Sequence, residues 1–433
     1  MQWSPKLLTD IIRTPGIDAP RIVLHDLNQD NADLIARYAG VVARHLNREA
    51  EITVEADLGR ALDGADYVII TVSTGGLDAM EIDVTLPEDY GIYHTVGDTS
   101  GPGGWSRLVR NFGVFQGFAE AIAKYAPGAL VLNYTNPLTT LTDVLSRLSG
   151  VPVVGLCHGL FDNIAILGRI YGVEEADLAL SYGGLNHCYF VTRARIGDLD
   201  VIADLLARVG EGQSLTAMES EAGSGHDLGG HTSNRELATE LLRLTGVLPY
   251  LADRHTSEFL SWTINDLEAM ARYRLVRTPI DERRANQRRW VDEIGRSVTD
   301  GPTERQLEHT REAAADIIRA HWNNRPYVDV GNLPNHGQVP GLPHGVVVET
   351  AVQVDRNGFT PLAIEPLPRV ALQLLEGPAA MYQMVVDACL HGDRKLALQA
   401  LRIDPTTARL GTPQVEELGS RLLAAHERYI SCF

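Results

Sequence analysis

The stretch "DYVIITVSTGG", residues 66–76, is a buried-strand run that ends in Thr-Gly-Gly. A short apolar run bounded by turn residues is typical of a strand inside a sheet. Similar runs recur before and after it, and helical spacing fills the segments between them. This alternation predicts parallel βαβ units in an α/β, doubly wound Rossmann-type sheet. The strand-like segments are 21–27, 51–57, 66–73, 129–137 and 152–159, and the helix-like ones are 29–47, 107–125 and 138–148.

The second part of the chain has a different pattern. A helical segment at 160–171 leads to a hairpin-like region at 178–198, and residues 200–330 are mainly helical. The glycine-rich "EAGSGHDLGGH" (221–231) interrupts these helices, strand character returns at 345–364, and 367–403 is helical again. We therefore expect two domains: a doubly wound domain over 1–190, and a domain of mixed α+β structure over 191–433.

Composition narrows the class of protein. The chain has 433 residues and a net charge of −18, which argues against nucleic acid or an anionic membrane as its main partner. Its four cysteines are too few and too scattered for a disulfide framework, which favours a reducing, cytoplasmic location. No apolar run reaches the roughly 18 residues that a membrane span requires.

The chain opens on "MQWSPKLLTDII", where Ser4 is placed as a helix N-cap and Pro5 as the first helical residue. Asp26 closes the first strand-like run 22 residues later. A dinucleotide fold places its ribose-binding acid about 20 residues beyond a glycine-rich turn, although Asp26 could equally cap a helix. That strand and glycine turn would precede Met1, and we expect the upstream codons to encode them in frame.

Ligand-binding residues of a doubly wound sheet lie beyond the carboxyl ends of its strands. "STGG" (73–76), "NYTNP" (133–137) and "GLCHG" (155–159) occupy such ends, so Ser73, Gly75 and Asn133 become candidate cofactor contacts. Ser4 is a further candidate, because it lies at a helix N-terminus that could meet a pyrophosphate. The glycine-dense "GDTSGPGG" (97–104) could let backbone approach a ligand closely, or could be a connector.

Thiol and imidazole side chains follow the strand at 152–159. Cys157 and His158 are adjacent, and His187 lies 30 residues beyond Cys157. Thiolate with imidazole suits a transition metal, whereas a buried cysteine and a hydrogen-bonded histidine are the commoner explanation for such a pair. Asn136 and Asn186 stand at turns, where short polar side chains are frequent.

A charged segment at 246–262 carries Asp253, Arg254, His255 and Glu258. Arg254 and Glu258 are four residues apart and could pair on a helix. The same combination of acids, arginine and histidine is also what acid–base chemistry requires.

Taken in order and spacing, a series of segments over nearly the whole chain resembles glycoside hydrolase family 4. The resemblance implies a lactate dehydrogenase-like second domain, NAD and a divalent metal, typically Mn²⁺. It implies hydrolysis by transient oxidation at sugar C3, removal of the C2 proton, elimination and addition of water. The segments are "SPKLLTDII", "VLHDLN", "HTVGDTSGPGG", "LNYTNP", "GLCHG", "GLNH", "DRHTSEF", "VDRNGFTPL" and "GDRKLALQALRIDP".

The resemblance also implies residue roles. Cys157 and His187 match the metal ligands, Asn136 and Asn186 match substrate-contacting positions, and His158 matches an acid that assists the leaving group.

The base that removes the C2 proton is implied at Asp253, with Tyr250 as a second candidate because some members use a tyrosine there. The "CHG" sequence is similar to that of the α-glucuronidase branch and argues against a phosphorylated sugar. A uronate carboxylate needs a cation, which Arg169, Arg254 or another arginine could supply.

The expected partner is thus a small glycoside. Family members are usually dimers or tetramers, so the resemblance also implies a homodimer or homotetramer. The alternatives are an α-galactosidase or α-glucosidase of the same family, a simple NAD-dependent dehydrogenase, and an inactive truncated form or a non-catalytic binding protein.

Overall fold

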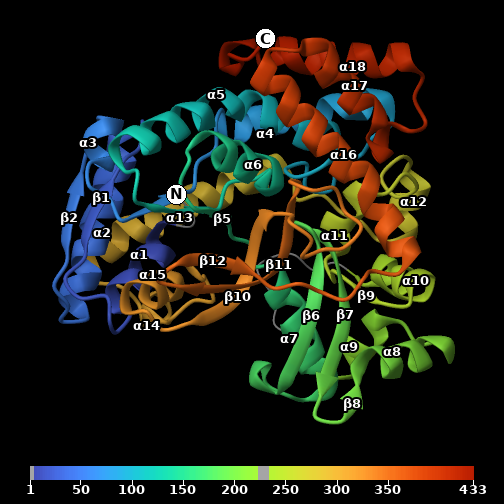
Figure 1. Ribbon diagram of the computed structural model, residues 1–433, viewed down its shortest axis with the longest axis horizontal. Coiled ribbons are helices and arrows are strands. Elements are labelled where there is room, and N and C mark those ends of the chain that lie inside the picture. The colour runs from blue at the N-terminus through green and yellow to red at the C-terminus, as the bar shows by residue number, and fades with distance from the viewer. Residues whose placement is uncertain (1–3, 223–233) are drawn as a thin grey trace.

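The computed structural model describes residues 4–222 and 234–433, and its first half alternates helices and short strands (Figure 1). All five strands predicted in this half form, each shorter than its apolar run. The elements are α1 (Ser4–Arg13), β1 (Arg21–Leu24), α2 (Gln29–His45), β2 (Glu51–Val54), α3 (Leu58–Leu62), β3 (Tyr67–Ile70), α4 (Gly76–Thr85), α5 (Gly101–Tyr125), β4 (Leu130–Asn133), α6 (Leu138–Leu148), β5 (Val153–Gly155) and α7 (Gly159–Tyr171).

Parallel pairing in this half confirms the predicted doubly wound α/β class. Strands β3, β4 and β5 are neighbours in that order and run parallel, as do β1 and β2. In the described part of the chain β1 pairs only with β2, so these two form a separate sheet, and β3 pairs only with β4. β4 is buried along its whole length, whereas β1 and β3 are mostly half-buried.

The second half extends the same sheet with antiparallel strands. Asn332 pairs with Gly155, so the sheet order continues from β5 through β10, β11, β6 and β7. The elements are β6 (Leu178–Leu185), β7 (Cys188–Ile196), β8 (Leu199–Asp200), α8 (Val201–Gly210), α9 (Leu215–Glu221), α10 (Glu236–Thr245), β9 (Leu248–Pro249), α11 (Asp253–Thr256), α12 (Leu267–Arg272), α13 (Ile280–Asp300), α14 (Glu304–Leu307), α15 (Ala314–Asn323), β10 (Tyr327–Pro334), β11 (Val347–Asp355), β12 (Gly358–Pro361), α16 (Arg369–His391), α17 (Arg394–Ile403) and α18 (Thr412–Ala425).

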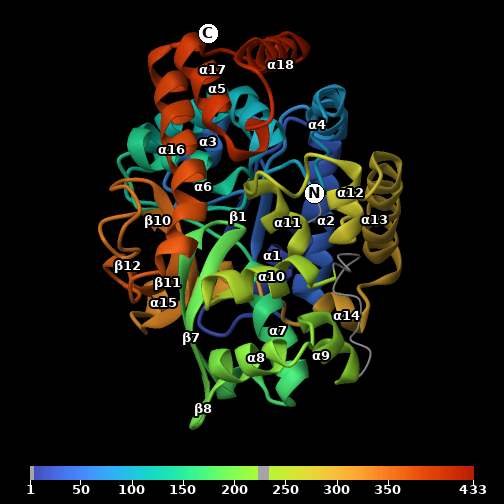
Figure 2. The same cartoon turned by 90° about the vertical axis from the view of Figure 1, so that its right-hand side faces the viewer.

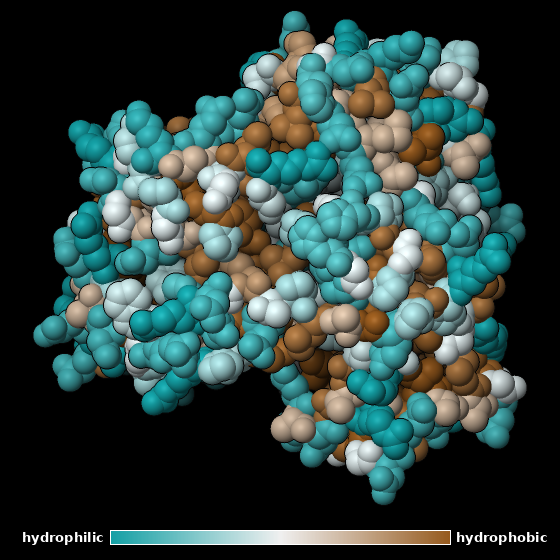
Figure 3. Space-filling view, viewed as in Figure 1, coloured by the Kyte–Doolittle hydropathy of each residue, from teal (hydrophilic) through white to brown (hydrophobic). Residues whose placement is uncertain are grey.

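The main core lies where α5 and α6 meet the C-terminal helices α16–α18, which gather at one end of the molecule (Figure 2). Trp105 and Phe115 of α5 are buried there. A second core lies under the β6–β7 hairpin and α7–α10, and a third under α1 and α15. Figure 3 shows a notch in the surface between the part of the molecule that contains the β6–β7 hairpin and the part that contains α14.

The start of α5 differs from the prediction. The helix begins at Gly101 rather than near 107, so half of the glycine-dense segment is helical. Glycine has a poor helix propensity, which is why the spacing pattern did not extend to it. Packing explains its presence, because a Cβ on Gly104 would lie 2.4 Å from the backbone of Thr99. The glycines therefore bring the first turn of α5 against residues 98–99.

Two other predictions need comment. Ser4 is the first described residue and already helical, so the cap of α1 falls outside the described residues. The predicted interruption at 221–231 follows α9, and its residues from 223 onward lie outside the described residues as well. Among the described helices, none combines the length and apolar character that a membrane span requires.

Candidate active site

The tip of the β6–β7 hairpin delivers two of the predicted site residues. Leu185 pairs with Cys188, so Asn186 and His187 form the two-residue turn between the strands. His187 adopts a left-handed φ of 65°, a conformation that hairpin turns need and that costs a non-glycine residue some strain. Both side chains are buried, so this turn points into the protein instead of into solvent.

Cys157 meets His187 at this point. Cys157 follows β5, and its Sγ lies 3.3 Å from His187 Nε2. Thr99 Oγ1 donates to Asp98 Oδ1 at 2.7 Å and therefore accepts from His187 Nδ1 at 2.8 Å. This chain of hydrogen bonds leaves the Nε2 lone pair on the side of the cysteine, as in a histidine that binds metal. The structure thus brings the two predicted metal ligands together.

Asp98 and His255 complete a compact donor cluster. Ligand atoms of Asp98, His187 and His255 all lie within 4.8 Å of one another. The His187 and His255 rings have centroids 4.0 Å apart. His255 was noted from the sequence only within a charged segment, and Asp98 was not singled out. Asp98 could have been considered as a site residue because it lies in the glycine-dense segment 97–104, whose backbone could approach a ligand closely.

Glu258 holds the Asp98 loop in place. Its Oε1 accepts from the backbone N–H groups of Thr95, Val96 and Gly97 at 2.8, 2.7 and 2.9 Å. The carboxylate is 1% exposed and lies beside His94. The spacing allowed Glu258 to pair with Arg254, and the two side chains do interact electrostatically. Glu258 in addition fixes the loop that presents Asp98.

The titration of the cluster follows from burial and neighbouring charges. Burial raises the pKa of the Cys157 thiol, and Glu349 adds to this, against hydrogen bonds from Gly159 and Asn186. Burial also raises the pKa of Asp98, but His255, His187 and Arg107 outweigh it and hold that pKa well below its usual range. These effects favour the ionised form of Asp98 and the neutral thiol of Cys157.

The remaining predicted polar residues lie around this cluster. Asn136 Nδ2 donates to Asp98 Oδ2 at 3.2 Å, and Arg107 donates to the Asn136 carbonyl at 2.9 Å. His158 is exposed and precedes the first turn of α7. Asn186 is wholly buried and donates to Glu349 at 2.9 Å.

Tyr250 lies against the cluster. Its ring centroid is 6.2 Å from that of His187, with the rings nearly parallel. Its hydroxyl donates to Asp162 at 3.3 Å, and a Cβ on Gly159 would lie 3.0 Å from the same hydroxyl. Burial and Asp162 raise the pKa of Tyr250 well above its usual value. The glycine of the "CHG" motif thus leaves room for the tyrosine.

Asp253 has a different position from the one predicted for a base. Both of its carboxylate oxygens accept backbone N–H groups, from Leu237 at 2.8 Å and Ala238 at 3.0 Å. Asp253 therefore caps the first turn of α10 from outside that helix. Burial still raises its pKa to about 7. Both Asp253 oxygens are engaged by α10, so its role as the base stays a prediction, and Tyr250 is the phenol in contact with the cluster.

The arginines predicted to bind a carboxylate have different surroundings in the structure. Arg169 pairs with Glu219 and is thereby neutralised. Arg254 is buried and donates to the Thr95 carbonyl and the Thr278 hydroxyl at 3.1 Å each. Arg283, near the start of α13, was not predicted, since nothing local in the sequence marks it. Its Nε is buried with no hydrogen-bond partner among the described residues.

The residue predicted to bind the ribose of a dinucleotide is more exposed than the cluster around His187. Asp26 follows β1 with an exposed carboxylate that accepts from the Asn28 backbone at 2.8 Å. The alternative that Asp26 caps α2 is wrong, because Asn28 is that cap. Leu27 beside it is 96% exposed. An exposed carboxylate next to an exposed apolar side chain fits a ribose and the face of a base.

The other predicted cofactor contacts are parts of turns. Ser73 accepts from Gly76 through its carbonyl at 3.1 Å, and Gly75 precedes α4 with a φ of 79°, which glycine alone adopts readily. Asn133 is wholly buried, and its side chain accepts from Thr135 at 3.0 Å. The Asn133 side chain therefore shapes its own loop, and only the Ser73 side chain is exposed.

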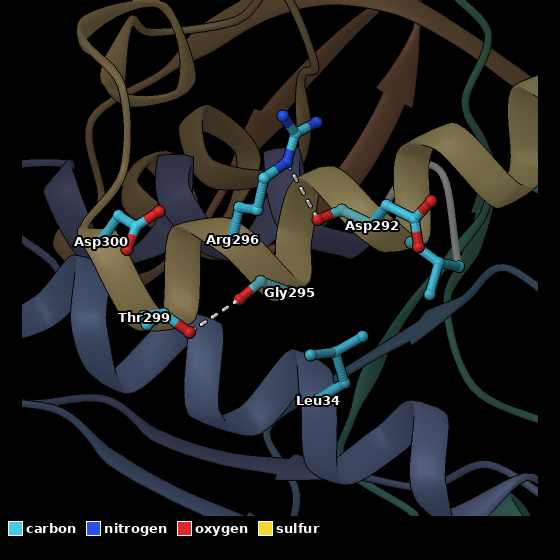
Figure 4. Close-up of a pocket in the computed structure, with 7 residues that line it drawn as sticks. Leu34, Asp292, Gly295, Arg296, Thr299 and Asp300 are labelled. Atoms are coloured by element: carbon cyan, nitrogen blue, oxygen red, sulfur yellow. Dashed lines mark hydrogen bonds between the residues drawn. The ribbon is translucent and has the colours of Figure 1, made fainter.

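The cluster at Cys157 suits a divalent transition metal. One thiol, two imidazoles and a carboxylate form a mixed soft and hard donor set, and Thr99 orients one imidazole through its second nitrogen. Cys157 and His187 could hold the ion, with Asp98 and His255 within reach. A surface hollow between α2 and α13 (Figure 4) shares no residue with this cluster, and the hydrogen bonds drawn there are within α13.

Comparison with known proteins identifies the family. The family described as "Family 4 glycosyl hydrolase" matches residues 1–172, and its C-terminal domain matches 182–407. An α-galacturonidase of Bacillus subtilis is 31% identical, over 93% of this chain and 90% of that protein. The chain therefore belongs to family 4 of the glycosyl hydrolases, a family of glycosidases.

Solved structures agree with this assignment. A Bacillus subtilis protein described as a glucosidase superposes with a TM-score of 0.85 at 29% identity, covering 98% of this chain and 97% of that one. A 6-phospho-α-glucosidase from gut microorganisms, solved with NAD and Mn²⁺, gives 0.83 at 18% identity, covering 99% and 97%. A Cryptosporidium parvum lactate dehydrogenase gives 0.53 at 14% identity, covering 90% and 95%, a likeness of fold alone.

Proposed function

We propose that this chain is an α-glycosidase that releases an α-linked hexuronic acid, with α-galacturonides as the first substrates to test. The sequence favoured α-glucuronides, which differ from galacturonides only in configuration at C4. Support for the galacturonide comes from relatives of that name, one 29% and one 31% identical to this chain.

The observation that carries the uronide proposal is a pair of arginines beside the metal-ligating cluster. Arg254 and Arg283 interact electrostatically with each other and with Asp98, and burial lowers the pKa of both. Glu258, whose charge acts on both arginines, also accepts the backbone N–H groups of Thr95, Val96 and Gly97. A partly dehydrated cationic pair of this kind favours an anionic substrate group, and a carboxylate matches the guanidinium fork.

The residues around the cluster divide the remaining work. NAD, held at Asp26 and the loops after β3 and β4, would accept and return a hydride, and Mn²⁺ at Cys157 and His187 would act as a Lewis acid. Asn136 and Asn186 would hold sugar hydroxyls. His158, at the exposed rim, would protonate the leaving group.

Tyr250 would receive the C2 proton. Its hydroxyl already donates to Asp162 at 3.3 Å, so the phenolic proton can move to that carboxylate as the oxygen takes the proton from the sugar. This pairing explains how a tyrosine with a raised pKa serves as a base without first becoming a free phenolate.

The test is turnover of aryl α-galacturonide, α-glucuronide and α-galactoside with NAD, Mn²⁺ and a thiol reductant. We expect cleavage of the uronides, loss of activity in chelator, recovery with Mn²⁺, no accumulation of NADH, and solvent deuterium at C2 of the product. Net NADH formation would instead indicate a dehydrogenase. Undiminished activity in chelator without NAD would contradict the mechanism, and NAD binding without any turnover would indicate a binding protein.

A further inference from the structure

A wholly buried carboxyl group lies behind the hairpin tip. Glu349 is on β11, opposite Asn332 of β10 and Gly184 of β6. Its side chain is 0% exposed. Its Oε2 accepts from the side-chain amides of Asn186 and Asn332, each at 2.9 Å. Burying a carboxyl group costs folding free energy unless hydrogen bonds compensate for it. None of the roles proposed above involves Glu349.

The hydrogen bonds of Asn186 have a defined direction. Asn186 Nδ2 donates to Glu349, and the same side chain hydrogen-bonds the Cys157 sulfur. Glu349 Oε2 accepts both amides, and an accepting oxygen requires the NH₂ group of Asn186 to face it. The amide oxygen, Oδ1, must then face the opposite way. Oδ1 is buried and has no hydrogen-bond partner among the described residues.

From this geometry we propose that Glu349 is a positioning residue that locks the Asn186 amide so that Oδ1 accepts a hydrogen bond from a substrate hydroxyl. The proposal rests on the proposed function, since it assigns the acceptor for a sugar hydroxyl beside Cys157. It explains the orphaned oxygen, because a substrate hydroxyl supplies the donor that the protein does not.

Asn332 holds the Glu349 carboxylate in position. Its amide donates to Glu349 and, at 3.3 Å, to the carbonyl of Gly155, two residues before Cys157. Glu349 thereby joins the strand that carries the cysteine to the turn that carries the asparagine. A glutamine at 349 could present either its oxygen or its NH₂ to Asn186, so the amide would no longer have one orientation.

A double-mutant cycle tests this role. Glu349→Gln and Asn186→Ala should each lower kcat/KM for an aryl α-galacturonide roughly 10- to 100-fold, and the double variant should be no worse than Asn186→Ala alone. Glu365→Gln is the matched control, because Glu365 also accepts from two side chains, Ser181 and Thr192, but on the surface. It should leave kcat/KM unchanged. Equal losses from Glu349→Gln in both backgrounds, or no loss, would overturn the proposal.

A spectroscopic readout separates this proposal from the proposed function. In protein labelled with ¹⁵N-asparagine, Glu349→Gln should shift the Asn186 NH₂ signals and speed their hydrogen exchange, whereas Glu365→Gln should not. Unchanged signals would overturn the proposal even if uronides are cleaved. Shifted signals in a protein that cleaves no uronide would retain the lock and reject the proposed function. If Glu349→Gln does not fold, Glu349→Asp, which withdraws the carboxylate by one methylene, takes its place in both measurements.

Discussion

The candidate metal-binding residues and the predicted dinucleotide-binding residues of this protein are held in opposite ways. Cys157, His187, Asp98 and His255 come from distant segments, and each is held by contacts between those segments. Asp26, Ser73 and Asn133 each have a hydrogen-bond partner two or three residues away in their own turn, and Asn133 also donates to Thr142. The predicted metal-binding residues are therefore preorganised by tertiary structure, whereas the predicted cofactor residues depend mainly on local chain geometry.

The strongest test of this contrast compares one residue from each region. Cys157→Ser should lower kcat by at least roughly 10³-fold, because a neutral hydroxyl is a poor replacement for a thiolate ligand. Asp26→Ala should raise the KM for NAD by about 10-fold with little change in kcat, as expected for one exposed hydrogen-bonding acid. Cys432→Ser, a thiol remote in sequence and outside the cluster, is the control. Equal effects of the Cys157 and Asp26 variants would break the comparison. The readout is steady-state kinetics on an aryl α-galacturonide.

A second test asks which residue in the charged segment acts on the substrate. Tyr250→Phe removes only the hydroxyl and should lower kcat by roughly 10²- to 10³-fold with KM nearly unchanged. A slower wash-in of solvent deuterium at C2 should accompany the loss. Full activity of Tyr250→Phe would assign the base elsewhere.

Arg283 sharpens the contrast further, because no local signal marked it. Arg283→Gln should lower kcat/KM for uronides by about 10- to 100-fold while sparing any activity on neutral galactosides. The neighbouring Arg284, paired with Asp78, Glu81 and Asp281 on the surface, offers the control Arg284→Gln. An equal loss on charged and neutral sugars would remove Arg283 from specificity.

The smallest effect is expected from Asp253. Asp253→Ala should cost about 1–2 kcal/mol of unfolding free energy, the usual value for a lost helix cap, measured by urea denaturation. Its kcat should change much less than that of Tyr250→Phe. A loss of kcat as large as in Tyr250→Phe, at unchanged stability, would restore Asp253 as the base.

From the sequence alone the doubly wound class could be predicted, because strand periodicity and turn residues are local properties. The family, and with it the pairing of Cys157 with His187, followed from the resemblance carried by the order of the motifs. The sequence also indicated the loops that follow the strands, because the loop residues have hydrogen-bond partners only a few residues away.

Only the tertiary structure decided the roles that depend on distant contacts. It made Asp253 a cap of α10, brought Asp98 and His255 to His187, and placed Arg283 and Glu349 beside the candidate site. These outcomes depend on which buried groups satisfy one another's hydrogen bonds and charges. Those hydrogen bonds and charge contacts join segments that are remote in sequence, so they cannot be predicted from the spacing of residues along the chain.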